Sequence, residues 1–92
     1  SCIRDLNMFQ AYLWLCVLQG SLAPVEDELV RLCTMVMPRV GVPWEMIVQW
    51  NEILMEAVLD RTSLSQQPIL QPFMSGFIKA FQEAQEHFIE EP

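Results

Sequence analysis

The polar and apolar positions of residues 41–60 are arranged as on the surface of a single helix. Pro43 suits the first helical position, where its missing N–H is not needed, and Glu45 follows at the positive end of the helix dipole. At about 100° per residue the polar side chains form one stripe roughly 80° wide, and nearly every other position is apolar. We therefore expect a helix at the centre of the fold with a solvated stripe of Glu45, Gln49, Glu52, Glu56 and Asp60.

The same periodicity predicts two helices before this one. Residues 5–19 carry apolar side chains on two sides, so both sides are expected to be buried, and Gly20 ends the helix in the usual C-terminal manner. A second helix begins at Pro24, with acidic residues in its first turn, and Pro38 stops or bends it. Because residues 39–42 form a short connection, we expect the second and third helices to pack as a helical hairpin.

Residues 61–67 are predicted to form the longest loop, and a last helix follows to about residue 90. Either Pro68 opens this helix and Pro72 kinks it, or the helix begins at Pro72 after a short irregular turn, which we favour. Its apolar residues recur at steps of four and three, as in helices that pack at about 20°. Gly76 within it indicates that another backbone comes close. No strand pattern occurs, so the sequence predicts an all-α four-helix bundle of antiparallel hairpins.

Length and composition limit the possible partners. The 92 residues suffice for one domain, of which 52% are hydrophobic, so we expect a partner or a second copy to cover some apolar surface. The net charge of −7, with only five basic residues, disfavours nucleic acid and anionic membranes as partners. The longest apolar run, residues 11–18, is far shorter than the roughly 20 residues of a membrane-spanning helix. The chain begins at Ser1 without a methionine, as expected of a fragment excised from a longer protein.

Few residues suggest catalysis or metal binding. His87 has Glu83 and Glu90 one turn away, but this set is too small for a metal site, and we interpret it as a solvated surface. The sequence has no Gly-rich phosphate loop, no nucleophile elbow and no Ser/His/Asp set. We therefore expect no enzyme activity, no cofactor and no metal. The three cysteines lack Cys-x-x-Cys spacing and are predicted to be reduced structural thiols in a cytoplasmic protein.

Asn51 is the one polar residue on the apolar side of the 41–60 helix, beside Trp44, Met55 and Val58. The three tryptophans of the chain are assigned to the core or to a subunit interface, with a cofactor cage as an alternative. A buried indole N–H requires a partner, which Asn51 could supply. Alternatively, Asn51 faces its own copy across a dimer axis and fixes the register, or it lies at a rim and reaches water.

Two segments resemble a known family. Residues 42–56 have the pattern V-P-x-E-x-I-V-x-W-N-x-x-L-x-E, which resembles the segment I-P-x-E-x-I-I-x-I-H-x-x-x-L in the N-terminal regulatory domain of RsbU-type serine phosphatases. Residues 80–83, with the sequence A-F-Q-E, are similar to A-Y-Q-E near the end of that family's last helix. The C-terminal domain of KaiA-type clock proteins has a similar pattern.

The resemblance implies a dimeric helical bundle without activity of its own. In the phosphatase family this domain receives an RsbT-like switch kinase, which then activates a catalytic domain further along the polypeptide. In the clock family the related bundle binds a peptide tail of a partner ATPase. The family's histidine in the central helix falls on Asn51 here, so an ionic or pH-sensitive role at this position cannot be carried over.

From these observations we predict a homodimerising, partner-binding regulatory domain of a cytoplasmic bacterial signalling protein. The predicted partner site is a ridge made of Trp44, Val48, Asn51 and Met55. The predicted dimer interface lies on the first and last helices and consists of Leu13, Val17, Phe77, Phe81 and Phe88. The alternative is a small-molecule or chromophore-binding sensor bundle whose Met and Trp residues line a pocket.

Overall fold

The computed structural model describes residues 2–86, with side chains from residue 6 onward. It contains four α-helices and, over these residues, no strand: α1 (Cys2–Gln19), α2 (Val30–Val36), α3 (Trp44–Asp60) and α4 (Gln67–Ala84). A π-helical turn, η1 (Pro24–Leu29), leads into α2, and a 3-10 turn, η2 (Met37–Val40), follows it. The all-α prediction is confirmed for this part of the chain.

Glycines close two of the helical segments. Gly20 follows α1 with a φ of 66°, and Gly41 follows η2 with a φ of 75°. In each case the glycine N–H donates to the carbonyl three residues back, and the next N–H donates to the carbonyl five residues back. The α-helix α2 ends at Val36, just before Pro38, in line with the prediction, and the 3-10 turn η2 continues from Met37 to Val40. Pro43 stands just before α3 with an extended backbone instead of opening the helix from within.

The start of α4 differs from the favoured prediction. α4 begins at Gln67, with Pro68 in its first turn and Pro72 inside the helix. Both prolines are exposed, and Pro72 removes one helical hydrogen bond, the one to the Pro68 carbonyl. The Gln67 side chain holds this start in place, because its amide nitrogen donates to the carbonyls of Leu59 and Thr62 at 3.2 and 3.3 Å.

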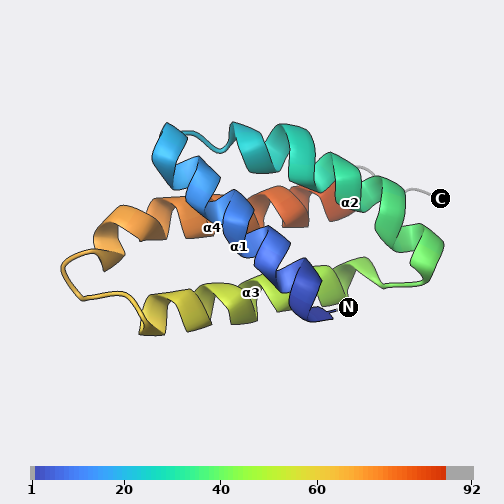
Figure 1. The fold of residues 1–92 in the computed structure, drawn as a ribbon. Helices are drawn as coiled ribbons and strands as arrows, with labels where there is room; N and C mark the ends of the chain where they lie inside the picture. The colour runs from blue at the N-terminus through green and yellow to red at the C-terminus, as the bar shows by residue number, and fades with distance from the viewer. Residues whose placement is uncertain (1, 87–92) are drawn as a thin grey trace.

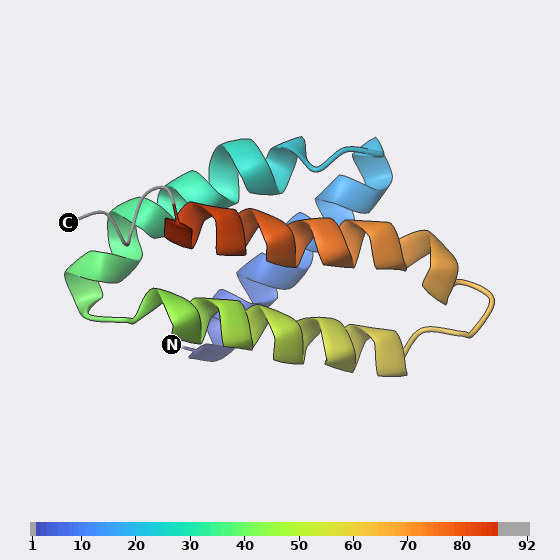
Figure 2. The ribbon, with the colours of Figure 1, turned by 180° about the vertical axis from the view of Figure 1, so that it is seen from behind.

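α4 contacts all three of the other α-helices. Figures 1 and 2 show α3 and α4 side by side and antiparallel, while α1 crosses both obliquely and α2 lies beyond α4. The predicted hairpin of the second and third helices is therefore wrong, although the connection is short. α3 lies at an edge of the molecule and not at its centre, and its acidic stripe is exposed as predicted. The oblique α1 also departs from the near-parallel packing that heptad spacing favours.

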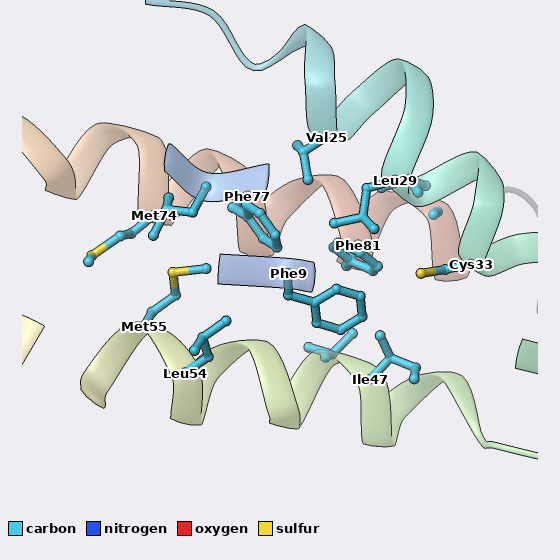
Figure 3. Packing of buried hydrophobic residues seen from close by; sticks show 14 of the residues in the cluster. Phe9, Val25, Leu29, Cys33, Ile47, Leu54, Met55, Met74, Phe77 and Phe81 are labelled. Carbon is cyan, nitrogen blue, oxygen red and sulfur yellow. The ribbon is translucent and has the colours of Figure 1, made fainter. Parts of the chain in front are cut away.

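An aromatic cluster forms part of the core. The rings of Phe9, Trp44 and Phe77 each lie 5.6 to 5.7 Å from the ring of Phe81, measured between centroids. Figure 3 shows Phe9, Phe77 and Phe81 converging from α1 and α4, with Ile47 of α3 below them. This cluster lies where α3 begins and α4 ends.

The second apolar side of α1 is less buried than its sequence predicts. Leu15 and Leu18 are exposed, whereas Phe9, Leu13 and Cys16 on the first side are fully buried. The reason is that α1 crosses the α3–α4 pair with one face, and η1 covers only part of the rest.

Gly76 marks a close approach of a side chain, whereas the sequence predicts a close backbone. A Cβ atom at this position would collide with the Cδ1 atom of Leu22, from the turn between α1 and η1. A residue that weakens helices therefore lies in the middle of α4 because Leu22 rests against it there.

Candidate functional site

The predicted partner-binding ridge lies inside the molecule. Trp44, Val48, Asn51 and Met55 are each at most 8% exposed, because this face of α3 packs on α1 and α4. The Trp44 indole N–H donates to the Phe81 carbonyl at 2.7 Å, and the two rings stack. In this conformation the four residues hold the helices together and leave almost no surface for another protein.

Asn51 is fully buried, and neither its amide nitrogen nor its side-chain oxygen has a hydrogen-bond partner. The interpretation as a rim residue that reaches water is therefore wrong. The interpretation as a partner for an indole is also wrong, because the Trp44 N–H goes to Phe81 and the Asn51 side chain accepts nothing. A contact between Asn51 and its own copy across a dimer axis stays a prediction, and it requires the chain to open.

The residues predicted for the dimer interface are mostly core residues of the single chain. Leu13, Phe77 and Phe81 are fully buried, and Val17 is half-buried. Phe88 lies outside the described residues. Of the four that the structure describes, only Val17 can touch a second copy without rearrangement.

A groove opens at the opposite end of the α3–α4 pair from the aromatic cluster, beside the loop that joins the two helices. Its volume is about 510 Å³. Trp14 and Ile69 are exposed by 39% and 62%, while Leu54, Val58 and Leu70 beneath them are buried. We call it the Trp14 groove and define it by Trp14 of α1, Leu54, Val58 and Arg61 at the end of α3, and Ile69 and Leu70 of α4.

The loop beside the Trp14 groove is held by its own side chains. The Thr62 hydroxyl donates to the Val58 carbonyl at 2.7 Å, and the Gln67 amide binds the carbonyls of Leu59 and Thr62. These bonds engage carbonyls at the C-terminal end of α3, which helices leave without intrahelical partners. They also tie the first turn of α4 to the last turn of α3, so the groove is formed before any partner arrives.

The electrostatic character of the Trp14 groove differs from that of the surrounding surface. Arg61 is the one charged residue that lines it, and its other polar lining is neutral, from Gln10, Thr62 and Gln66. Three other surface grooves are each lined by at least one carboxylate. Arg61 forms no ion pair within the side chains that the structure describes. In a chain with a net charge of −7, the groove is thus an apolar patch with one unpaired cation.

Sequence reasoning misses the Trp14 groove for two reasons. It assigns the tryptophans to the core or to a subunit interface without distinguishing them, and the uncertain start of the last helix conceals the position of Ile69. The spacing around Trp14 gives no signal either, because its neighbours on a helix are Gln10, Ala11, Val17 and Leu18, and three of these four are apolar.

The described part of the chain has no cluster of reactive side chains that suggests catalysis or metal binding. Cys16 and Cys33 are buried and free of disulfides, as predicted, and burial raises the pKa of the Cys16 thiol. A raised pKa makes a thiol a poor nucleophile near neutral pH. Within residues 6–86 no three His, Cys, Asp or Glu side chains gather as a metal ion requires. The predicted cluster around His87 lies outside the described residues.

Comparisons with family models, with curated proteins and with solved structures found no match to this chain. The resemblance to RsbU-type regulatory domains therefore stays a prediction, and the candidate site is defined by its geometry. None of the helices in residues 2–86 combines the length and the apolar character that crossing a bilayer requires.

Proposed function

We propose that this chain is a non-catalytic, protein-binding regulatory domain of a bacterial signalling protein. The resemblance of residues 42–56 and 80–83 supports a role like that of the RsbU-type N-terminal domain, which receives a switch kinase or a similar activator and controls an attached phosphatase domain. The observation that carries the proposal is the Trp14 groove, which is apolar, open to solvent and built jointly by α1, α3 and α4.

The partner site of this proposal is the Trp14 groove and not the buried ridge of α3. Tryptophan and arginine are among the residues that dominate binding energies at protein interfaces, and the groove has one of each. A partner that covers Trp14 and Ile69 removes apolar surface from water without moving any core residue. Binding through the groove is thus compatible with the fold as it stands.

Homodimerisation is a separate part of the proposal. It is supported by the resemblance, and a second copy would have exposed apolar side chains to cover, since Leu18 of α1, Met35 of α2 and Val40 of η2 are each more than half exposed. Light scattering of the purified chain measures this part alone. A monomer mass at every concentration contradicts the dimer and leaves the groove proposal intact.

Two isoleucines with the same exposure provide a matched test of the groove. Ile69 lines the Trp14 groove, Ile53 lies outside it on α3, and both are 62% exposed. The chain and its Ile69→Gln and Ile53→Gln variants are immobilised and used to capture proteins from a lysate of the source organism. Captured proteins are identified by mass spectrometry, purified and titrated against the three forms.

We expect the unmodified chain and Ile53→Gln to bind the same signalling protein with equal affinity. Ile69→Gln should bind it about fivefold more weakly, because the substitution removes an apolar interaction that contributes about 1 kcal/mol. Equal binding by all three forms shows that the groove is not the partner site. A chain that binds no protein in purified form overturns the proposed function.

A ligand-sensing bundle is the second candidate, since two methionines line a different groove between α3 and α4. Met55 and Met74 contribute to this groove, whose volume is about 440 Å³. Methionine adapts its shape to varied apolar ligands, although Glu52 and Glu56 at the same groove disfavour anionic ones. Native mass spectrometry distinguishes the two functions, because a sensor purifies with a bound chromophore or lipid.

A further inference from the structure

The shape of the Trp14 groove suits the side chains of a helix. The groove has a volume of about 510 Å³ and is open to solvent, so the side chains on one face of a helix can enter it while the helix itself lies across the opening. Side chains at positions i, i+3 or i+4, and i+7 project together from one face in this way.

The exposure of the rim favours a helix over a small molecule. Sites for small ligands enclose about 70–90% of the ligand surface. The side chains of Trp14 and Ile69 face solvent, so a small apolar molecule in this groove would stay wet along one side. A helix laid across the groove covers Trp14 and Ile69 themselves and buries its own apolar face at the same time.

Arg61 determines the charge that the occupant must carry. It caps the C-terminal end of α3, it has no ion pair within the described side chains, and no carboxylate lines the groove beside it. The chain as a whole has a net charge of −7, so an acidic segment is attracted only near one of its few basic residues. Within the groove an acidic side chain is therefore accepted beside Arg61, which fixes the orientation of a bound helix.

We propose that the Trp14 groove binds an amphipathic helix of a partner protein, with apolar side chains against Trp14 and Ile69 and an acidic side chain paired with Arg61. This inference rests on the proposed function and adds the chemistry of the partner's binding segment. The helix supplies three apolar anchors on one face and its acidic residue at the edge of that face.

A peptide display library tests this inference even while the partner protein is unidentified. Helix-forming peptides with one randomised face are selected on the purified chain, on Arg61→Glu and on Arg39→Glu. Arg39 is the matched control, because it is exposed and lies in η2, outside the groove. Selected peptides are then titrated against each form and against Ile69→Gln by calorimetry.

The unmodified chain and Arg39→Glu should enrich the same peptides, with apolar residues at helical spacing and Asp or Glu at one fixed position. Selection on Arg61→Glu should exchange that acidic residue for Lys or Arg. Peptides selected on the unmodified chain should bind Arg61→Glu about tenfold more weakly, as expected when one exposed charge pair is reversed. They should bind Ile69→Gln about fivefold more weakly, because a polar side chain then replaces one apolar anchor point.

Two results overturn the inference. One is enrichment of peptides that lack a fixed acidic position or that bind Ile69→Gln unchanged. The other is the absence of enriched peptides, together with stoichiometric binding of laurate that Ile69→Gln abolishes, which assigns the groove to a small amphiphilic carboxylate. If the lysate experiment still yields a protein whose binding depends on Ile69, the proposed function survives and only the helical, acidic nature of the segment is wrong.

Discussion

The two ends of the α3–α4 pair each have a tryptophan, but they use it in opposite ways. At the end where α3 begins, Trp44 is buried, stacks on Phe81 and donates its N–H to the Phe81 carbonyl. At the end where α3 stops, Trp14 is 39% exposed and borders a groove. The first end closes the core, and the second leaves apolar surface accessible. In the proposed function, stability and binding are thereby separated along the same pair of helices.

This separation explains why the residues that stand out in the sequence are not those of the candidate site. Trp44 and Asn51 lie within the segment that resembles a known family, yet both are buried in the core. Trp14, Arg61 and Ile69 belong to no motif and come together only when α1 crosses the loop end of the α3–α4 pair. Residues of the groove can be substituted without unfolding the chain, because the aromatic cluster lies at the other end of the α3–α4 pair.

The largest expected effect comes from exchanging the two tryptophans for alanine. Trp44→Ala should lower the free energy of unfolding by about 3–5 kcal/mol, since it opens a cavity beside Phe81 and removes a buried hydrogen bond. Trp14→Ala should lower it by about 1 kcal/mol, because its ring is partly in water already. Urea unfolding followed by far-UV circular dichroism measures both.

If Trp44→Ala does not fold, Trp44→Phe keeps the experiment decisive. It retains most of the ring packing and removes only the bond to the Phe81 carbonyl, so the expected loss is about 1–2 kcal/mol. If Trp44→Ala and Trp14→Ala lower the free energy of unfolding equally, the α3–α4 pair is not divided into a packed Trp44 end and an exposed Trp14 end.

The next effect in size has the opposite sign and concerns Asn51, which lies on α3 between the two ends. Asn51→Leu should raise the free energy of unfolding by about 1–3 kcal/mol, because an unpaired buried amide is replaced by an apolar side chain of similar size. The same denaturation experiment measures it. Light scattering on Asn51→Leu adds a second readout, since a dimer whose affinity does not change excludes a role for Asn51 at a dimer axis. A loss of stability shows that the amide is satisfied in solution.

Local patterns in the sequence predict local features of this fold well. The helices, the closing role of Gly20, the proline at the start of η1 and the exposed acidic stripe of α3 all depend on residues within a few positions of one another. The burial of Leu13 and Phe77 also follows from their spacing. What spacing cannot decide is whether a buried apolar face meets another helix of the same chain or a second copy.

The candidate site fails to emerge from the sequence for a related reason. A short connection between two helices predicts that they are neighbours, but η2 and residues 41–43 lead α3 to the opposite side of α4 from α2. The groove depends on that arrangement, because α3 and α4 form its floor as neighbours. The oblique path of α1 then brings Trp14 to the same groove as Ile69. Pro68 and Pro72 add to the difficulty, since two prolines at a spacing of four fit a loop as well as a helix start.

The smallest expected effect concerns the contact between Leu22 and Gly76, which joins the α1–η1 turn to the middle of α4. Gly76→Ala should leave the free energy of unfolding within about 0.5 kcal/mol, because the cost of moving the Leu22 side chain offsets the gain of about 1 kcal/mol in helix propensity. Ser75→Ala, at the exposed neighbouring position, is the control and should leave stability within about 0.5 kcal/mol.

A double-mutant cycle separates the contact from the propensity. In a Leu22→Ala background the obstructing side chain is gone, so Gly76→Ala should raise the free energy of unfolding by about 1 kcal/mol. The gain in stability from Gly76→Ala should therefore be larger in the Leu22→Ala background by about 1 kcal/mol. An equal effect in both backgrounds means that Leu22 moves aside at no cost, and that its packing on α4 does not restrain the α1–η1 turn.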